Sequence, residues 1–364
     1  MRRLACAALV LVGCGATTPP PRPARPATGA PTAVSRAETP PPVAPLPDVE
    51  KVRADLGGVC ALARRRFACA TKDDPILRSL ATDVVDFDIS DRHRCVVLAT
   101  GRVRCAGSNA RGELGAGLSV GSVAHDVEAK GVTNAVRVAL AEGLSCALTS
   151  DGGVFCWGDN AMGQTGGPNH YVPELREWVV PTRVPLPGPM RGVAVTPSRA
   201  CAYDDARVFC WGIGRPPQQV QVSPPEVVHG VRERLFATAK NGDVFALDDR
   251  PVIAQRPLEL LRGAVELSED RGPLCGVTRA RNVVCDGDRR RYEDDPRRGP
   301  FVQALEPIAA KSSLTQRFGL VFVLAADGTV FVSGASAYMG ELGRLPTRSD
   351  VPVPLGNVAT APPP

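Results

Sequence analysis

The chain has few of the residues that catalysis most often uses. Its 364 residues include only four histidines, at positions 93, 125, 170 and 229, and no two stand at the spacing of metal ligands on one helix or strand. It contains no Gly-rich phosphate loop, no HExxH pair and no GxSxG elbow. The sequence therefore gives no sign of nucleotide-binding, zinc-protease or α/β-hydrolase chemistry, and we expect no cofactor and no metal.

The chain also has little net charge outside its N-terminal segment. The formal charge is +5, but residues 1–47 contribute a net +4 of it, from five arginines and Glu38. The remainder of the chain is therefore close to neutral. A neutral domain gives no electrostatic reason to expect nucleic acid as a partner.

The N-terminus resembles the signal of a bacterial lipoprotein. Arg2 and Arg3 precede an apolar run from residue 4 to residue 12, which is too short to span a bilayer. The following Leu-Val-Gly-Cys14 resembles a lipobox, which implies cleavage before Cys14 and acylation of that residue. An ordinary cleaved signal with an incidental cysteine is the alternative. Gly15, where an Asp would favour the inner membrane, points to the outer membrane of the cell envelope.

Residues 17–47 contain eleven prolines and almost no large apolar side chain. Such a segment buries too little surface to offset its ordering entropy and is extended. We therefore predict a signal peptide over residues 1–13, a lipidated tether over residues 14–47, a folded domain over residues 48–358 and a disordered tail over residues 359–364.

The folded domain repeats one β-hairpin. In its clearest copy, two short apolar runs flank the turn residues Ser150 to Gly153, a pattern typical of a hairpin. Seven copies align on their first positions: Cys60, Cys95, Cys146, Cys201, Phe236, Cys275 and Phe322. Their second positions are Cys69, Cys105, Cys156, Cys210, Ala246, Cys285 and Val332. Uneven spacing around a constant hairpin indicates insertions in the connecting loops.

A second motif, which we call the loop phrase, follows three of the hairpins. It reads GSNARGELG over residues 107–115 and GDNAMGQTG over residues 158–166, with a looser copy over residues 334–343. Together, strand, CAL, turn, CWG and loop phrase resemble the repeat of the regulator of chromosome condensation (RCC1) family. The resemblance covers about residues 50–358 and is weakest in the first, fifth and sixth copies, which lack the loop phrase.

The resemblance implies an all-β fold, a seven-bladed β-propeller of RCC1-like repeats. About 44 residues per copy suffice for one four-stranded blade, and a linear solenoid is the alternative. We expect residues 352–358 to pair with strands from residues 48–56, which would close the ring and leave no long sheet edge.

The cysteine spacing indicates disulfides within the hairpins. Each pair is separated by nine or ten positions, and opposite residues in a non-hydrogen-bonded pair lie close enough for a disulfide. The two copies that lack one cysteine lack both. We therefore predict the bonds Cys60–Cys69, Cys95–Cys105, Cys146–Cys156, Cys201–Cys210 and Cys275–Cys285. A zinc ribbon, a free catalytic thiol and reduced buried cysteines are the alternatives, and the spacing and the export signal argue against them.

Two insertions are candidates for partner binding, because loops on a rigid scaffold often bind partners. The insertion over residues 167–190 contains His170, Tyr171 and Trp178, and Trp178-Val179-Val180 could instead be an outer strand. The insertion over residues 286–301 contains Tyr292 among alternating Arg and Asp blocks, which also suit a solvated loop. His93, next to a hairpin strand, is expected to pack in the core.

We expect a non-enzymatic, membrane-anchored module that binds a protein partner at the bacterial cell envelope. A lyase or hydrolase at the centre of the propeller is an alternative, but it would need converging acidic or histidine side chains on the inner strands. Those strands read as largely apolar, as in residues 136–140 and 192–195. A purely structural envelope lipoprotein is the other alternative.

Overall fold

The computed structural model describes residues 49–54, 58–71, 78–117, 121–166, 179–247, 257–269, 274–286, 310–317, 320–325, 330–335 and 348–354. The chain falls into two units, Met1–Pro41 and Pro42–Pro364, and every described residue belongs to the second. The predicted signal peptide, Cys14, the tether and the tail over residues 359–364 lie outside the described residues. The described part of the chain contains no helix long and apolar enough to cross a bilayer.

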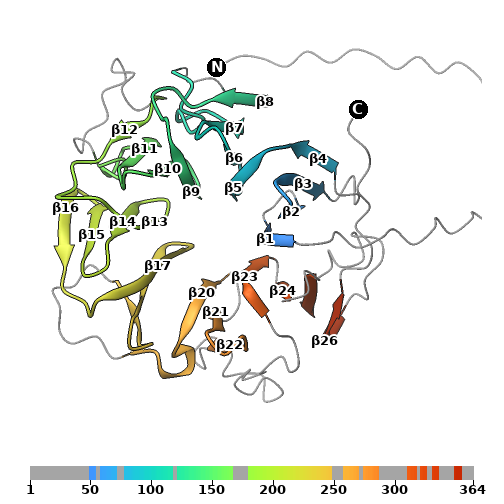
Figure 1. The fold of residues 1–364 in the computed structure, drawn as a ribbon. Helices are drawn as coiled ribbons and strands as arrows, with labels where there is room; N and C mark the ends of the chain where they lie inside the picture. The colour runs from blue at the N-terminus through green and yellow to red at the C-terminus, as the bar shows by residue number, and fades with distance from the viewer. Residues whose placement is uncertain are drawn as a thin grey trace, which may run out of the picture. The chain divides into compact units, whose positions relative to one another are not determined.

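The described residues form seven antiparallel sheets, each a meander of consecutive strands (Figure 1). Sheet 1 holds β1 (Val49–Ala54), β2 (Gly58–Ala63), β3 (Arg66–Thr71) and β4 (Arg78–Ala81); sheet 2 holds β5 (Val84–Ile89), β6 (His93–Leu98), β7 (Val103–Ser108) and β8 (Ser122–Glu128). Sheet 3 holds β9 (Ala135–Ala141), β10 (Leu144–Thr149), β11 (Val154–Gly158) and β12 (Thr182–Arg183); sheet 4 holds β13 (Gly192–Val195), β14 (Arg199–Tyr203), β15 (Val208–Gly212) and β16 (Arg215–Val220). Sheet 5 holds β17 (Pro225–Val231), β18 (Arg234–Ala239) and β19 (Val244–Ala246); sheet 6 holds β20 (Ala264–Ser268), β21 (Leu274–Thr278) and β22 (Val283–Asp286), after the short 3-10 helix η2 (Glu259–Leu261). Sheet 7 holds β23 (Ala310–Arg317), β24 (Leu320–Ala325), β25 (Val330–Ala335) and β26 (Arg348–Pro354).

Each predicted hairpin forms the second and third strands of one sheet. In sheet 3, Cys146 lies opposite Cys156, and the turn between them contains Asp151 and Gly152. Gly152 has a φ of 78°, and a Cβ at that position would lie 2.5 Å from the Cβ of Pro189. The turn therefore requires glycine for its backbone conformation and for the close approach of the following loop.

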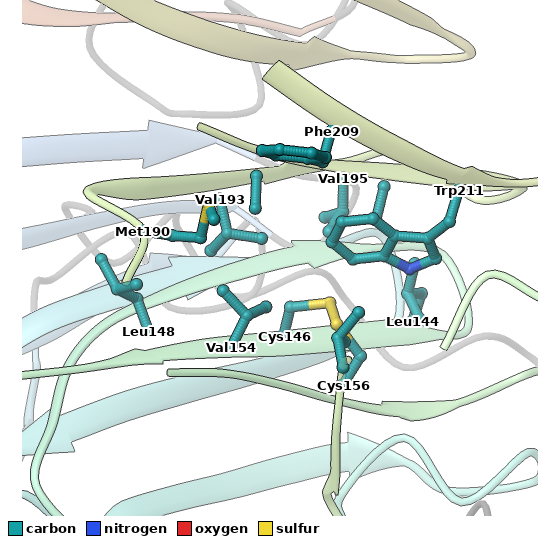
Figure 2. Packing of buried hydrophobic residues seen from close by; sticks show 13 residues of the cluster. Leu144, Cys146, Leu148, Val154, Cys156, Met190, Val193, Val195, Phe209 and Trp211 are labelled. Atoms are coloured by element: carbon teal, nitrogen blue, oxygen red, sulfur yellow. A yellow bond between two sulfur atoms is a disulfide. The ribbon is translucent and has the colours of Figure 1, made fainter. Parts of the chain in front are cut away.

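The first strand of each sheet contacts the first strand of the next, from β1 through β5, β9, β13, β17 and β20 to β23, and β23 contacts β1. The sheets thus follow one another around a common centre (Figure 1). Buried apolar clusters fill the spaces between successive sheets. In the cluster between sheets 3 and 4, Trp211 lies near Leu144 and the disulfide between Cys146 and Cys156 (Figure 2). This is the packing of an all-β propeller.

The sheets differ in completeness. Five have four strands, including sheet 1, whose repeat lacks the loop phrase, whereas sheets 5 and 6 have three strands among the described residues. A seven-bladed ring of four-stranded sheets is thus seen in part, because the described residues of sheets 5 and 6 supply three strands each. Residues 248–256 and 287–309, which follow their last strands, lie outside the described residues.

The expected pairing between the two ends of the domain is wrong. β26 pairs with β25, with Val353 opposite Val332, and β1 pairs with β2. The tail therefore supplies the outer strand of its own sheet and is not shared with sheet 1. Closure depends instead on packing of side chains, because Leu324 of β24 lies in one buried cluster with Val49 and Val52 of β1.

Four predicted disulfides are present in the structure: Cys60–Cys69, Cys95–Cys105, Cys146–Cys156 and Cys201–Cys210. In each pair the two Cα atoms are 4.0–4.1 Å apart, as expected for opposite residues without a direct backbone hydrogen bond. Cys275 is also disulfide-bonded, and its register partner is Cys285, whose side chain lies outside the described residues.

Candidate functional site

The inner strands carry charged residues at two positions fixed by the hairpin register. The residue opposite each first hairpin position lies seven places earlier in the chain; these residues are Arg53, Asp88, Ala139, Ala194, His229, Ser268 and Thr315. Since side chains alternate along a strand, the residue two places earlier shares the same side. Those residues include Lys51, Asp86, Arg137, Gly192, Val227 and Glu266. We call the two sets together the inner positions.

Ion pairs at the inner positions join consecutive sheets and also sheets that are distant in sequence. Lys51 Nζ lies 2.8 Å from Asp86 Oδ1, which links sheets 1 and 2. Arg53 pairs with Asp88 at 3.4 Å and with Glu266 at 2.8 Å, so that its guanidinium joins sheets 1, 2 and 6. Burial lowers the pKa of Arg53, but Glu266 and the two aspartates outweigh it, and the pKa is raised overall.

The same carboxylates also bind the backbone of sheet 3. Asp86 Oδ2 accepts a hydrogen bond of 3.0 Å from the Val138 amide, and Asp88 Oδ2 accepts one of 2.8 Å from the Leu140 amide. The inner strands of neighbouring blades are not paired as a sheet, so these bonds satisfy amides of β9 that have no partner strand on that side. Each aspartate is thus engaged by a cation and by a backbone amide.

His229 adds no free base to this group. Burial lowers its pKa to about 3, with a further contribution from the charge of Arg53, so the imidazole is neutral. Its Nε2 lies 3.3 Å from Thr238 Oγ1. No group of three or more metal-ligating side chains is found among the described residues.

The expectation of apolar inner strands is therefore right for sheet 4 and wrong for sheets 1, 2 and 6. The carboxylates are nonetheless tied to cations and backbone amides, a network that holds sheets together. Each of these carboxylates, Asp86, Asp88 and Glu266, already has a cation as its partner.

The loop phrases lie at the other end of the strands from the hairpin turns, and we call this end of the propeller the loop face. Gly107, where the first phrase begins, is the register partner of His93 at the start of β6. Within that phrase, Asn109 Oδ1 accepts a hydrogen bond of 3.0 Å from the Leu114 amide. In the second phrase, Asn160 Oδ1 accepts one of 3.1 Å from the Thr165 amide. The asparagine of each phrase thus closes its own loop.

Each of these loops is bound by a tryptophan from the next sheet. Trp157 Nε1 donates to the Glu113 carbonyl at 2.7 Å, and Trp211 Nε1 donates to the Gln164 carbonyl at 2.9 Å. Both indoles are fully buried. The residue equivalent to Trp157 in sheet 2 is Ala106, and the preceding sheet has no loop phrase. In sheets 3 and 4 the tryptophan therefore occurs where the previous repeat along the chain supplies a loop for it to bind.

His93 lies in a chain of hydrogen bonds between sheets 2 and 3. Its Nδ1 is 2.7 Å from Ser90 Oγ, and its Nε2 is 2.8 Å from Ser145 Oγ. Ser145 Oγ donates to the Glu113 carbonyl at 2.9 Å, so we assign the proton of the imidazole to Nε2. Burial lowers the pKa of His93 to about 4. The predicted core role of His93 is confirmed.

The predicted partner-binding residues His170, Tyr171, Trp178 and Tyr292 lie outside the described residues. Val179 is described and buried, and its Cα would lie 2.8 Å from a Cβ added to Gly112. The outer strand of sheet 3 is Thr182–Arg183, so the interpretation of residues 178–180 as a strand is wrong for Val179 and Val180.

Two exposed apolar residues on the loop face were not predicted from the sequence. Met162 of the second loop phrase is 49% exposed, and Ile213, which follows β15, is 41% exposed. The Gly214 amide donates to the Met162 carbonyl at 3.0 Å, so that the two residues lie together. Ile213 has a φ of 50°, which is an outlier for a β-branched residue. The signal available in the sequence was WGIG in place of WGDN after the hairpin.

The two tryptophans should differ in their contribution to stability. The Glu113 carbonyl also accepts from Ser145, whereas the Gln164 carbonyl has only Trp211 as a donor among the described residues. Trp211→Phe should therefore lower the free energy of unfolding more than Trp157→Phe, by about 1 kcal/mol, because it leaves a buried acceptor unpaired. Chemical denaturation of both variants measures this difference. Equal losses would contradict it.

Stability should fall in weak acid because of His93. Its folded pKa of about 4 lies below the ordinary value of 6.5, so the unfolded chain binds the proton first as the pH falls. The free energy of unfolding should therefore drop between pH 6.5 and pH 4, by at most about 3 kcal/mol. Carboxylates also titrate at the acidic end, so the measured quantity is the difference between the wild type and His93→Gln. If the two proteins show parallel pH profiles, the assignment to His93 is wrong.

Comparisons with known proteins agree with the repeat and the fold. Residues 145–164, which cover most of β10, β11 and the second loop phrase, match the model of the regulator of chromosome condensation (RCC1) repeat. No curated protein matches the chain in sequence.

Similar solved structures include human WBSCR16, with a TM-score of 0.62 and 16% identity over 81% of this chain and 86% of that one. Prp20p from Saccharomyces cerevisiae has a TM-score of 0.57 and 17% identity, over 77% of this chain and 76% of that one. Yeast RCC1 (Prp20) bound to Kap60 has a TM-score of 0.55 and 16% identity, over 74% of each chain. These identities are low, and the similarity shows the fold alone. Residues 145–164 thus match an RCC1-type repeat, and the hairpin repeat, the loop phrases and the ring of sheets agree with the all-β propeller fold of these structures.

Proposed function

We propose that the chain is a non-enzymatic interaction module, anchored to the bacterial outer membrane through Cys14, whose seven sheets act as the blades of one propeller. It binds a protein partner through the loop face. The observation that supports this most is the exposed pair Met162 and Ile213, held on a scaffold fixed by the buried tryptophans. A rigid scaffold with exposed apolar anchors is the usual construction of a protein-binding surface.

The position of Met162 and Ile213 in the chain also favours the loop face as the binding surface. Met162 lies four residues before Gly166, after which the insertion with His170, Tyr171 and Trp178 begins. The strained backbone of Ile213 supports the same assignment, because strained residues often occur at functional sites. Prp20p, a similar propeller, is described with binding to Gsp1p and histones. We propose protein binding for this chain without assigning it either partner.

Membrane attachment should depend on one side chain. In the host, Cys14→Ala should prevent acylation and move the protein from the membrane fraction to the soluble fraction, because the acyl group on Cys14 is the proposed anchor. Fractionation with mass spectrometry of the N-terminus measures the change. Cys6→Ala, which alters the other cysteine of the signal segment, is the control. Membrane retention of the unacylated variant would refute the anchor.

Partner binding should depend on the exposed pair of the loop face. The full chain with a C-terminal tag should capture a partner from envelope extract, and Met162→Ser with Ile213→Asn should reduce that capture at least about tenfold. Asn tolerates positive φ, so this variant should fold at least as stably as the wild type. The matched control is Leu80→Ser, because Leu80 is 43% exposed on β4, away from the loop phrases.

A second bait replaces residues 167–178 with a short Gly-Ser linker and keeps Val179, whose packing on Gly112 belongs to the scaffold. Loss of the partner with this bait would assign a part in binding to the insertion. Capture that survives both the double substitution and the replaced segment would refute the loop face as the binding surface. Capture of nothing by the wild type would leave a structural envelope role as the better account.

A further inference from the structure

The opposite end of the inner strands carries a second exposed apolar pair. Val85 of β5 is 39% exposed and Val136 of β9 is 46% exposed. Both occupy the same place in their sheets, since each is the extra residue of a β-bulge. Val84 pairs with Leu98 and Asp86 with Val97, so Val85 has no register partner.

The bulge of β9 has the same form. Ala135 pairs with Thr149 and Arg137 with Leu148, which leaves Val136 between them without a partner. β5 and β9 are neighbours in the ring (Figure 1). Bulges turn side chains out of the regular alternation and are enriched at functional sites. Here they place two valines at the start of adjacent inner strands, at the end of the propeller opposite the loop face.

The equivalent bulges of sheets 1 and 5 carry polar residues that have partners, and that of sheet 6 carries the half-buried Val265. Glu50 of β1 accepts a hydrogen bond of 3.1 Å from the Arg64 amide, and Glu226 of β17 pairs with Arg279. The exposed valines therefore do not follow from the bulge geometry itself. They are a feature of sheets 2 and 3.

Arg137 follows Val136 and is exposed, and no carboxylate partner is found for it among the described residues. Asp86 of β5 binds the amide of Val138, the residue after Arg137. Both oxygens of that carboxylate are already engaged: Oδ1 by Lys51 and Oδ2 by the Val138 amide. The other cations of the inner positions, Lys51 and Arg53, are paired. Arg137 is thus left as an available guanidinium that directly follows Val136 in β9.

We propose that Val85, Val136 and Arg137 form a binding site, here called the valine rim, for a protein segment that presents a carboxylate flanked by apolar side chains. The guanidinium binds the carboxylate, and the valines cover the apolar neighbours. Arginine forms a bidentate, charge-assisted pair with a carboxylate, which selects this group over a neutral amide of the same shape. The valine rim lies at the other end of the strands from the loop face, so its occupant is additional to the partner proposed there.

The test uses the full chain with valine methyl labels and two capped tripeptide probes, Leu-Glu-Leu and Leu-Gln-Leu. The Glu probe should shift the methyl signals of Val85 and Val136 in a saturable way. The Gln probe should bind about tenfold more weakly, the ratio expected for loss of one charge-assisted hydrogen bond. Arg137→Gln should remove this preference and leave the protein folded, because the side chain is exposed and has no carboxylate partner among the described residues.

Arg92→Gln is the matched control, because Arg92 is 66% exposed and lies beside the start of β6, near the loop face. It removes one positive charge and should leave the preference unchanged. Equal binding of the two probes, no saturable shift, or a preference that survives Arg137→Gln would each overturn the proposal. The result does not depend on capture at the loop face, so failure of one proposal is distinguishable from failure of the other.

Discussion

The propeller depends on the contact between its first and last sheets. Each sheet can bury its apolar faces only if it has a neighbour on both sides, and the chain must therefore close on itself. Among the described residues, no strand from one end of the domain completes a sheet at the other end, since β26 pairs with β25 and β1 with β2. Closure depends on the packing of Val49 and Val52 with Leu324 and on the ion pairs that Arg53 makes. Arg53 joins the first sheet both to the second and to the sixth, so that one side chain links the start of the chain to a sheet near its end.

Neighbouring repeats are also matched to each other along the chain. A loop phrase in one sheet presents a backbone carbonyl, and a tryptophan in the next sheet donates its indole N–H to it. A buried indole needs a hydrogen-bond acceptor, and an empty loop site would leave a cavity. Loop and tryptophan therefore occur together in successive copies. This coupling gives the loop face a rigid base, on which Met162 and Ile213 are held in the open.

The fold could be predicted from the sequence because its signal is local and repeated. Hairpins such as Cys146 to Cys156 carry their own turn residues, and the paired cysteines report the register directly. The closure could not be predicted, because whether residues 348–354 pair with β25 or with β1 is decided by contacts remote in sequence. The charged inner positions were missed for a different reason. The sequence shows no regular spacing between Arg53, Asp88 and His229. Their common place becomes visible only when each is counted back seven residues from its hairpin position. The ion pairs of Arg53 also join strands that are far apart in the sequence.

The packing of β1 on the last sheet can be tested most directly by native-state hydrogen exchange. If closure has the role described here, the amides of β1 and β2 should exchange only through the same opening that exposes β9 and β10, with the same free energy. Sheet 1 would then be part of one cooperative unit. Exchange of sheet 1 through a separate opening of much lower free energy, with sheets 2 to 4 still protected, would contradict the account and describe an open chain of sheets.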